Sequence, residues 1–100
     1  ENGEGQEIKV TSSPVETVRG LHVNVMPNPS ETEFILHVKS DNHIDMLNIR
    51  VTDIYGRSLK VMKGTFDQTF RFGRNLIGGT YFAEVIQGNK QRVVKLIKLN

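Results

Sequence analysis

The sequence predicts an all-β domain, built as an antiparallel β-sandwich of about seven strands. Short segments in which apolar and polar residues alternate recur along the chain, which is the pattern of half-buried strands. Turn residues, mainly Gly, Asn, Asp and Pro, separate these segments, and no window keeps the period of a helix. Burial of one apolar face of each sheet would drive folding, at about 25 cal/mol per Å² removed from water.

The first half of the domain contains three expected strands. Alternation over residues 21–25 predicts the first, which ends at Pro27-Asn28-Pro29 because a proline cannot donate to a ladder. The second is expected over residues 34–39 and is followed by a polar turn at 40–43. The third is expected over residues 47–52.

A hairpin loop is expected after the third strand, at Asp53-Ile54-Tyr55-Gly56-Arg57. Gly56 allows a positive φ there, and Asp53 can accept hydrogen bonds from the loop. On the short strand that follows, we expect Leu59 and Val61 to face the core.

Alternation resumes after a break at Gly64. Residues 70–72 predict a strand, and the loop over 73–79 should bring Leu76 toward the core. Tyr81, Ala83 and Val85 then face inward on the next strand, which ends at a tight turn. That turn is Gln87-Gly88-Asn89-Lys90, and it leads to the last strand, 91–99. The apolar residues of this strand do not keep to one face, so its inward side stays open.

The beginning of the chain has a different composition. Residues 1–20 are polar and lack a sustained apolar period, so we interpret them as a linker and residues 21–100 as the domain. Because the sequence begins with Glu1 rather than Met, we expect it to be part of a longer protein.

Composition excludes several classes of function. There is no cysteine, which excludes disulfides and thiol chemistry. The longest apolar runs have three residues, too few for a transmembrane helix. The net charge of +2 is too small and too dispersed to favour a nucleic-acid partner. In Phe70-Arg71-Phe72-Gly73-Arg74 the alternating phenylalanines are more simply core residues than a stacking platform for bases.

No group of residues predicts a catalytic, cofactor or metal site. His22 and His37 fall on outward faces of separate strands, and with His43 we interpret them as surface histidines rather than metal ligands with Glu33 or Asp41. The Gly-x-Ser-x-Gly turn of serine hydrolases is absent, and no phosphate loop occurs. We therefore do not expect an enzyme.

Four short blocks nevertheless stand out. They are Val25-Met26-Pro27-Asn28-Pro29, Val51-Thr52-Asp53-Ile54-Tyr55-Gly56-Arg57, Leu76-Ile77-Gly78-Gly79-Thr80-Tyr81-Phe82, and Gly88-Asn89-Lys90 with Val93-Val94-Lys95-Leu96-Ile97-Lys98. Each block alone is a weak signal. Together, in this order and within residues 21–100, they resemble the type A C-terminal sorting domain of the type IX (Por) secretion system. The sequence departs from that family at Ile77, where proline or a small polar residue is common.

This resemblance implies both a fold and a function. The family fold is an immunoglobulin-like, seven-stranded sandwich, in agreement with the strand count above. Such domains lie at the extreme C-terminus of Bacteroidetes proteins that reach the periplasm first. The domain then directs an upstream cargo domain through an outer-membrane translocon with its shuttle protein. A surface sortase removes the domain and often joins the cargo, displayed or secreted, to anionic lipopolysaccharide.

Carried onto this chain, the resemblance implies a set of recognition residues and a cleavage region. Cleavage would fall in the linker, between Ser12 and Gly20. The recognition residues would be Pro27, Asn28, Pro29, Gly56, Arg57, Gly79, Tyr81, Lys90, Lys95 and Lys98.

The closing hairpin, residues 80–100, suggests a mechanism. If its last strand lies at a sheet edge, a receptor could pair with that edge by β-augmentation and read the lysines. The lysines could equally protect the edge from aggregation. The same edge could pair with a second copy of the chain to form a homodimer.

Two other functions fit a small β-sandwich. An adhesive or carbohydrate-binding module of a surface protein would use exposed aromatics, but there is no Trp, and the two Tyr are Tyr55 in a loop and Tyr81 on a core strand. A structural spacer between domains would need no sorting motif, and the fold alone does not exclude an enzyme.

Overall fold

The computed structural model of the chain describes residues 19–100, which fold into seven strands. Over this range there is no helix long and apolar enough to cross a membrane. Of the predicted linker, residues 1–20, all but Arg19 and Gly20 lie outside the described residues. The strands are β1 (Leu21–Met26), β2 (Phe34–Ser40), β3 (Leu47–Asp53), β4 (Ser58–Gly64), β5 (Gln68–Phe72), β6 (Gly79–Gln87) and β7 (Lys90–Lys98).

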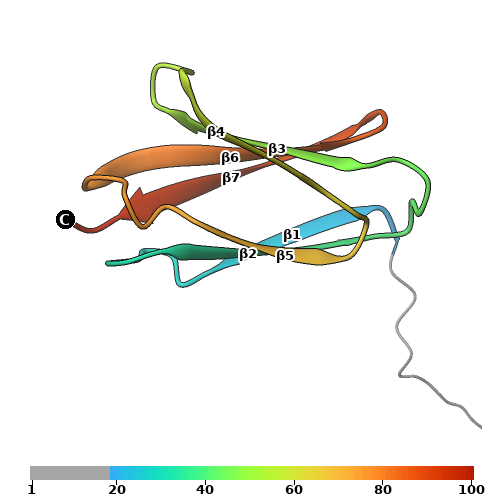
Figure 1. The fold of residues 1–100 in the computed structure, drawn as a ribbon, viewed down its shortest axis with the longest axis horizontal. Coiled ribbons are helices and arrows are strands. Elements are labelled where there is room, and N and C mark those ends of the chain that lie inside the picture. Colours follow the sequence, from blue (N-terminus) through green and yellow to red (C-terminus); the bar gives the residue numbers. More distant parts are fainter. Residues whose placement is uncertain (1–18) are drawn as a thin grey trace, which may run out of the picture.

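The strands form two sheets packed face to face (Figure 1). One sheet has the order β1-β2-β5 and the other the order β4-β3-β6-β7. Neighbouring strands within each sheet are antiparallel. This is an immunoglobulin-like arrangement in which the fourth strand has joined the sheet of the third, sixth and seventh. The prediction of an all-β sandwich of seven strands is confirmed.

A single apolar core lies between the sheets. Because side chains alternate across a strand, every second residue of β2, β3 and β6 points into this core. The rings of Phe34 and Phe72 stack across β2 and β5 with their centroids 5.6 Å apart. The predicted contribution of Leu76 is confirmed, since it packs against the core from the loop after β5. The other buried apolar residues are Leu21, Val25, Leu36, Val38, Leu47, Ile49, Val51, Phe70, Tyr81, Ala83, Val85 and Leu96.

Strand β4 differs from the prediction. Leu59 and Val61 are 44% and 60% exposed, so the prediction that they face the core is wrong. The pairing of β3 with β4 places Met62 opposite a buried residue, and Met62 is the side chain that packs against the core. The pairing also shifts between Val51 and Thr52. Because side chains alternate with a period of two, a register one residue away from the expected one moves the whole apolar set to the outer face.

Strand β7 faces the core through Val94, Leu96 and Lys98. Leu96 is fully buried, and Val94 is partly buried. Val93 and Ile97 lie on the outer face of the same strand, with Val93 54% exposed. Apolar residues on both faces explain why alternation alone left the inward side of this strand open.

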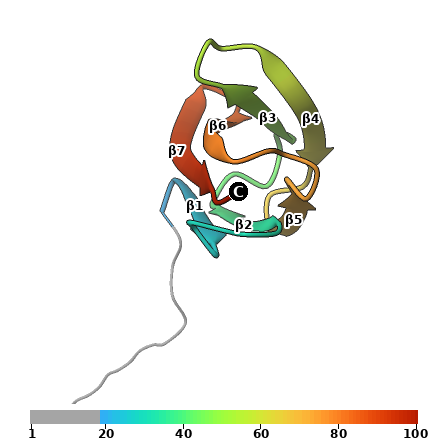
Figure 2. The same ribbon diagram turned by 90° about the vertical axis from the view of Figure 1, so that its left-hand side faces the viewer.

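The sandwich has two distinct ends. The loop after β1, the β3–β4 hairpin, the start of β6 and the end of β7 lie at one end, on the left in Figure 1, and Figure 2 looks onto it. Gly20 lies at the other end, where its carbonyl accepts the N–H of Asp41 from the loop after β2. The chain therefore enters the domain at the end opposite to its C-terminus.

Candidate functional site

Most of the residues expected to carry recognition gather at the end of the sandwich where the chain terminates. The end of β3 pairs with the start of β6, which pairs with the end of β7. An isolated parallel bridge between Ser30 and Lys98 adds the loop after β1. Blocks that are far apart in sequence therefore meet around the last strand. We call this the motif end and define it by residues 27–30, 54–57, 76–79 and 95–100.

The Pro-Asn-Pro corner is attached to β7 through the side chain of Asn28. Its Nδ2 donates to the carbonyl of Lys95 at 2.8 Å, and its Oδ1 accepts the N–H of Ile97 at 3.0 Å. The peptide bonds before Pro27 and Pro29 are both cis. One amide side chain thus takes up two backbone groups that an additional strand would otherwise bind.

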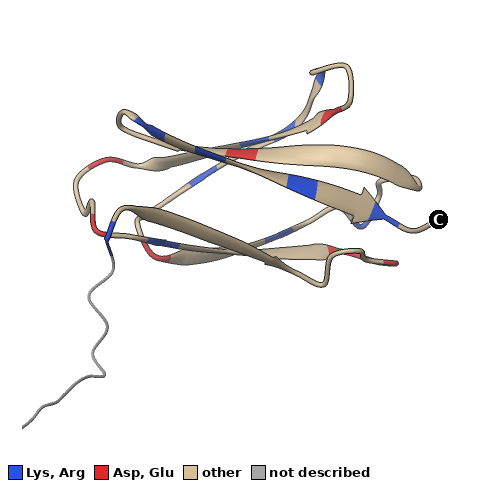
Figure 3. Ribbon diagram, turned by 180° about the vertical axis from the view of Figure 1, so that it is seen from behind, with Lys and Arg blue, Asp and Glu red and all other residues tan. Residues whose placement is uncertain are grey.

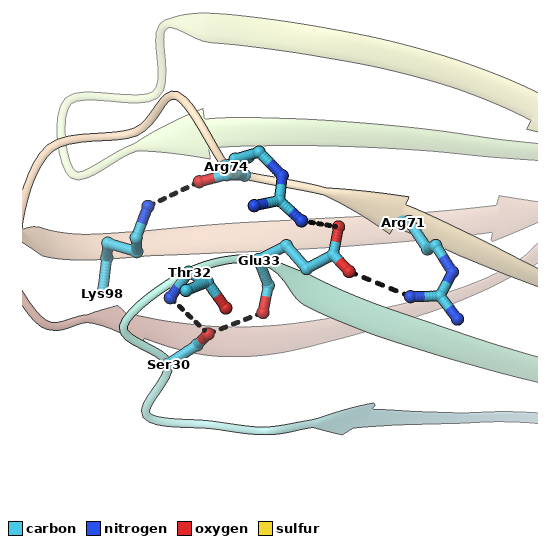
Figure 4. Close-up of polar contacts among 7 residues, drawn as sticks. Ser30, Thr32, Glu33, Arg71, Arg74 and Lys98 are labelled. Atoms are coloured by element: carbon cyan, nitrogen blue, oxygen red, sulfur yellow. Dashed lines mark hydrogen bonds and ion pairs between the residues drawn. The ribbon is translucent and has the colours of Figure 1, made fainter.

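Ser30 continues this attachment through its backbone. Its N–H donates to the carbonyl of Ile97 at 3.0 Å, and its own carbonyl accepts the N–H of Leu99 at 2.8 Å. The Oγ of this buried serine donates to the carbonyl of Glu33 at 2.6 Å and accepts the N–H of Thr32 (Figure 4). Together with Asn28, Ser30 closes the edge of β7 over its C-terminal half.

Lys98 is held inside the domain rather than on its surface. The residue is 5% exposed, and its Nζ donates to the carbonyl of Gly73 at 2.6 Å (Figure 4). It also donates to the carbonyl of Leu76 at 2.7 Å. The expectation that the lysines of the last strand charge its edge does not apply to this one. In the folded domain its ammonium anchors the loop after β5 to the last strand.

A surface ion-pair cluster flanks this anchor. Glu33 accepts from Arg71 at 2.9 Å and lies 3.5 Å from the guanidinium of Arg74 (Figure 4). Both arginines are largely exposed, so the pairs contribute little to stability, about 0–1 kcal/mol each. They join Glu33, beside the Ser30 turn, to β5 and to the start of the loop that follows it.

The two glycines at the start of β6, Gly78 just before it and Gly79 as its first residue, let the end of the chain approach closely. A Cβ on Gly78 would lie 2.9 Å from the Cα and N of Asn100, which is closer than atoms normally approach. Gly79 pairs with Lys98 at the start of β6. The buried Tyr81 donates its hydroxyl to the carbonyl of Ile77 at 2.7 Å. This block therefore shapes the seat of the last residues.

The β3–β4 hairpin is organised by Asp53, as predicted. Its Oδ1 accepts the N–H groups of Tyr55 and Arg57, and its Oδ2 accepts Nε of Arg57 at 2.6 Å. Gly56 has φ of +83°, which confirms the need for glycine. Burial alone would raise the pKa of Asp53, but the hydrogen bonds from Arg57 and Tyr55 outweigh it and hold the pKa below its usual value. The hairpin leaves the side chains of Tyr55 and Arg57 exposed, with the guanidinium 5.8 Å from the ring centroid.

Lys90 lies away from the motif end, at the turn between β6 and β7. There the buried Gln87 donates to the carbonyls of Asn42 and Asp45 and fixes the loop after β2. A backbone hydrogen bond from Gly20 is the main cause that holds the pKa of the nearby Asp41 below its usual value, and the charge of Lys90 adds to it. Lys95, in contrast, belongs to the motif end and projects from the outer face of β7.

The histidines lie as the alternation predicted. His22 and His37 are exposed on the outer face of the β1-β2-β5 sheet, where they line a shallow apolar hollow with Lys39. His22 contacts the carbonyl of Arg19, and His37 contacts Oγ1 of Thr69. Within residues 19–100 no group of three or more His, Cys, Asp or Glu could hold a metal ion.

Sequence reasoning missed how the motif end is held together. Asn28 was identified as a turn residue, but nothing in the order of residues shows that its amide binds a strand almost seventy positions away. The roles of Ser30 and Gln87 were missed as well. No signal in the sequence separates the buried Lys98 from the exposed Lys95, since both lie between apolar residues of the last strand.

Comparison with known proteins agrees with this arrangement. The model of the family described as secretion system C-terminal sorting domain matches residues 24–99, which is most of the chain and the whole of β2 to β7. No curated protein matches the chain. The matched region contains each of the blocks that meet at the motif end. The family it matches is described as a sorting domain and not as an enzyme. The chain therefore belongs to the secretion system C-terminal sorting domains, the tails that direct proteins through type IX (Por) secretion.

Proposed function

We propose that this domain directs an attached cargo protein across the outer membrane by type IX secretion and is then cleaved from it. The observation that carries this proposal is the family match over residues 24–99. Membership of the family implies a cargo upstream on the same chain, the type IX machinery as partner, and a destination at the cell surface or outside the cell. Passage through the periplasm precedes this step.

Recognition by the translocon and its shuttle protein would use the motif end. In support, Pro27, Asn28, Pro29, Gly56, Arg57, Gly79, Tyr81, Lys95 and Lys98 lie at or beside this end or shape it. Exposed side chains such as Arg57 and Lys95 would be read directly. The buried Lys98 and Tyr81 would act by holding the surface in shape.

Removal of the domain would take place at the opposite end. Cleavage between Ser12 and Gly20 by a surface sortase, with transfer of the cargo to anionic lipopolysaccharide, is the second part of the proposal. In support, Gly20 lies at the end remote from the C-terminus, so a protease could reach the preceding chain while the motif end stays bound. Lys90, which the resemblance includes among the recognition residues, lies at this opposite end as well.

The proposal is tested by changing the two ends separately in a reporter fused to the chain in a type IX-competent bacterium. The motif-end variant combines Arg57→Ser with Ile77→Ser, and the matched control combines the exposed Lys39→Ser with Ile44→Ser near the other end. Ile77 and Ile44 are both well exposed, at 79% and 91%, so neither pair should disturb the core. Loss of surface reporter only with the motif-end pair supports the proposal.

Equal export of both variants would overturn recognition at the motif end. The size of the surface product reports cleavage, and a ladder of lipopolysaccharide-linked reporter reports attachment. Binding of the chain to a glycan array would favour the carbohydrate-binding alternative instead.

A further inference from the structure

The edge of β7 is closed over only half of its length. Along an edge strand, alternate residues direct their backbone groups outward. In the C-terminal half of β7, the residues that do so are Lys95, Ile97 and Leu99. Asn28 binds the carbonyl of Lys95 and the N–H of Ile97. Ser30 binds the carbonyl of Ile97 and the N–H of Leu99. By the same alternation, the backbone N–H and carbonyl groups of Gln91 and Val93 and the N–H of Lys95 also face outward. We call these groups the open edge.

The open edge has no backbone partner among residues 19–100, and of its groups only the carbonyl of Gln91 is bound, by Nη1 of Arg92 at 2.8 Å. β7 is the last strand of its sheet, and apart from the Ser30 bridge no pairing joins it to the neighbouring β1. Val94 on β7 and Val23 on β1 both face the core but remain only partly buried. Unpaired backbone beside incompletely covered apolar side chains is the arrangement that accepts an additional strand.

Charge indicates which kind of strand fits. Lys90, Arg92 and Lys95 are all exposed on β7 (basic positions recur along this strand in Figure 3), and a Cβ on Gly20 would lie 4.0 Å from Nη2 of Arg92. Of the nearby carboxylates, Glu84 already pairs with Arg50 at 3.1 Å. Two copies of so basic an edge would repel one another, whereas an acidic segment would be attracted.

The edges at β5 and β4 are less suited to this role than the edge at β7. β5 has only five residues, and the pairing that holds β4 is interrupted between Val51 and Thr52. Short strands and bulges are the usual means of blunting an edge. β7 has nine residues in unbroken register with β6. Closure by Asn28 also gives an incoming strand a fixed stopping point at Lys95, and hence a defined register.

We propose that the open edge at Gln91–Lys95 binds an extended, acidic strand of the export machinery by β-augmentation. The added strand would pair with the backbone of Val93, cover Val94 with an apolar side chain, and place carboxylates beside Arg92 and Lys95. This inference rests on the proposed sorting function and names the chemistry of its partner.

The test separates the backbone donor from the side chain. Val93→Pro removes an N–H that has no partner inside the domain, and an edge strand tolerates proline at such a position. Val93→Thr keeps the N–H and the branched shape. Each variant is placed behind the same reporter in a type IX-competent host, and its folding is checked by thermal unfolding of the 100-residue chain. We expect Val93→Pro to lower surface reporter by about tenfold or more, and Val93→Thr by less than about twofold.

Charge reversal provides a second variant that does not disturb the strand. Arg92→Glu with Lys95→Glu should lower export by about tenfold, whereas Lys60→Glu with Lys63→Glu on the β4 edge should leave it within about twofold. If the proline variant and the β7 reversal are both folded and exported like the wild type, the inference is wrong. A reporter that lacks the whole chain is run in parallel, because its export would contradict the sorting function itself.

Discussion

Asn28 contacts the last strand in the way that a neighbouring strand would, by accepting the N–H of Ile97 at 3.0 Å and donating to the carbonyl two residues earlier. Through Asn28, the Pro-Asn-Pro block and the terminal block form one structural unit. Asn28→Ala should lower the free energy of unfolding by about 1–2 kcal/mol, because two hydrogen bonds are lost from a partly solvated site. Denaturant unfolding measures this change.

Hydrogen exchange identifies which of these bonds matters. The amide of Ile97 should exchange faster in Asn28→Ala and remain protected in Asn28→Asp, since aspartate keeps the acceptor and loses only the donor. Protection of Ile97 that is unchanged in Asn28→Ala would contradict this description of the corner.

Lys98 and Lys95 should respond differently to the same substitution. Lys98→Met leaves the carbonyls of Gly73 and Leu76 without their donor in a buried site, and it should cost about 2 kcal/mol. Lys95→Met changes an exposed side chain and should stay within about 0.5 kcal/mol. Equal losses in chemical denaturation would show that the buried ammonium has no special role.

The hairpin at Gly56 gives a prediction about backbone conformation. Gly56 has φ of +83° and nothing within 4 Å of the place of a Cβ, so the cost of substitution is conformational rather than steric. Gly56→Ala should cost about 1 kcal/mol and Gly56→Asn clearly less, because asparagine adopts positive φ more readily. The order of the two melting temperatures decides the point, and the reverse order would be inconsistent with it.

Asp53 should make stability depend on pH in the acid range. Its pKa is held below the usual 3.8 in the folded domain, so the charged carboxylate stabilises the fold at neutral pH. This contribution is present above about pH 4 and is lost as the pH falls through the lower, folded-state pKa. The Asp53→Asn variant should therefore melt below the wild type at neutral pH, and the difference should shrink as the pH is lowered through the folded-state pKa. A difference that is constant with pH would argue against the ionised hairpin.

The sequence predicts the fold well because the fold depends on local patterns. Alternation and turn residues located all seven strands, and the Asp53 turn followed from residue chemistry alone. The predictions fail where residues distant in the sequence determine whether a side chain is buried or exposed. The register of β4 exposes Leu59 and Val61, and the two loop carbonyls that hold Lys98 inside the domain come from more than twenty residues earlier in the chain.

The candidate site was only partly predictable for the same reason. The blocks were visible as blocks, but their meeting at one end follows from the pairing of β3 with β6 and of β6 with β7. Lys90, identified with the others, lies at the opposite end because it begins the strand that Lys98 ends.

Export itself is the most direct test of the account. A reporter with a periplasmic signal peptide is expressed with and without the 100-residue chain at its C-terminus, in a type IX-competent bacterium and in a derivative that lacks the outer-membrane translocon. We expect reporter on the surface or in the medium only when both the chain and the translocon are present. Equal export of the reporter without the chain, or through cells without the translocon, would contradict it.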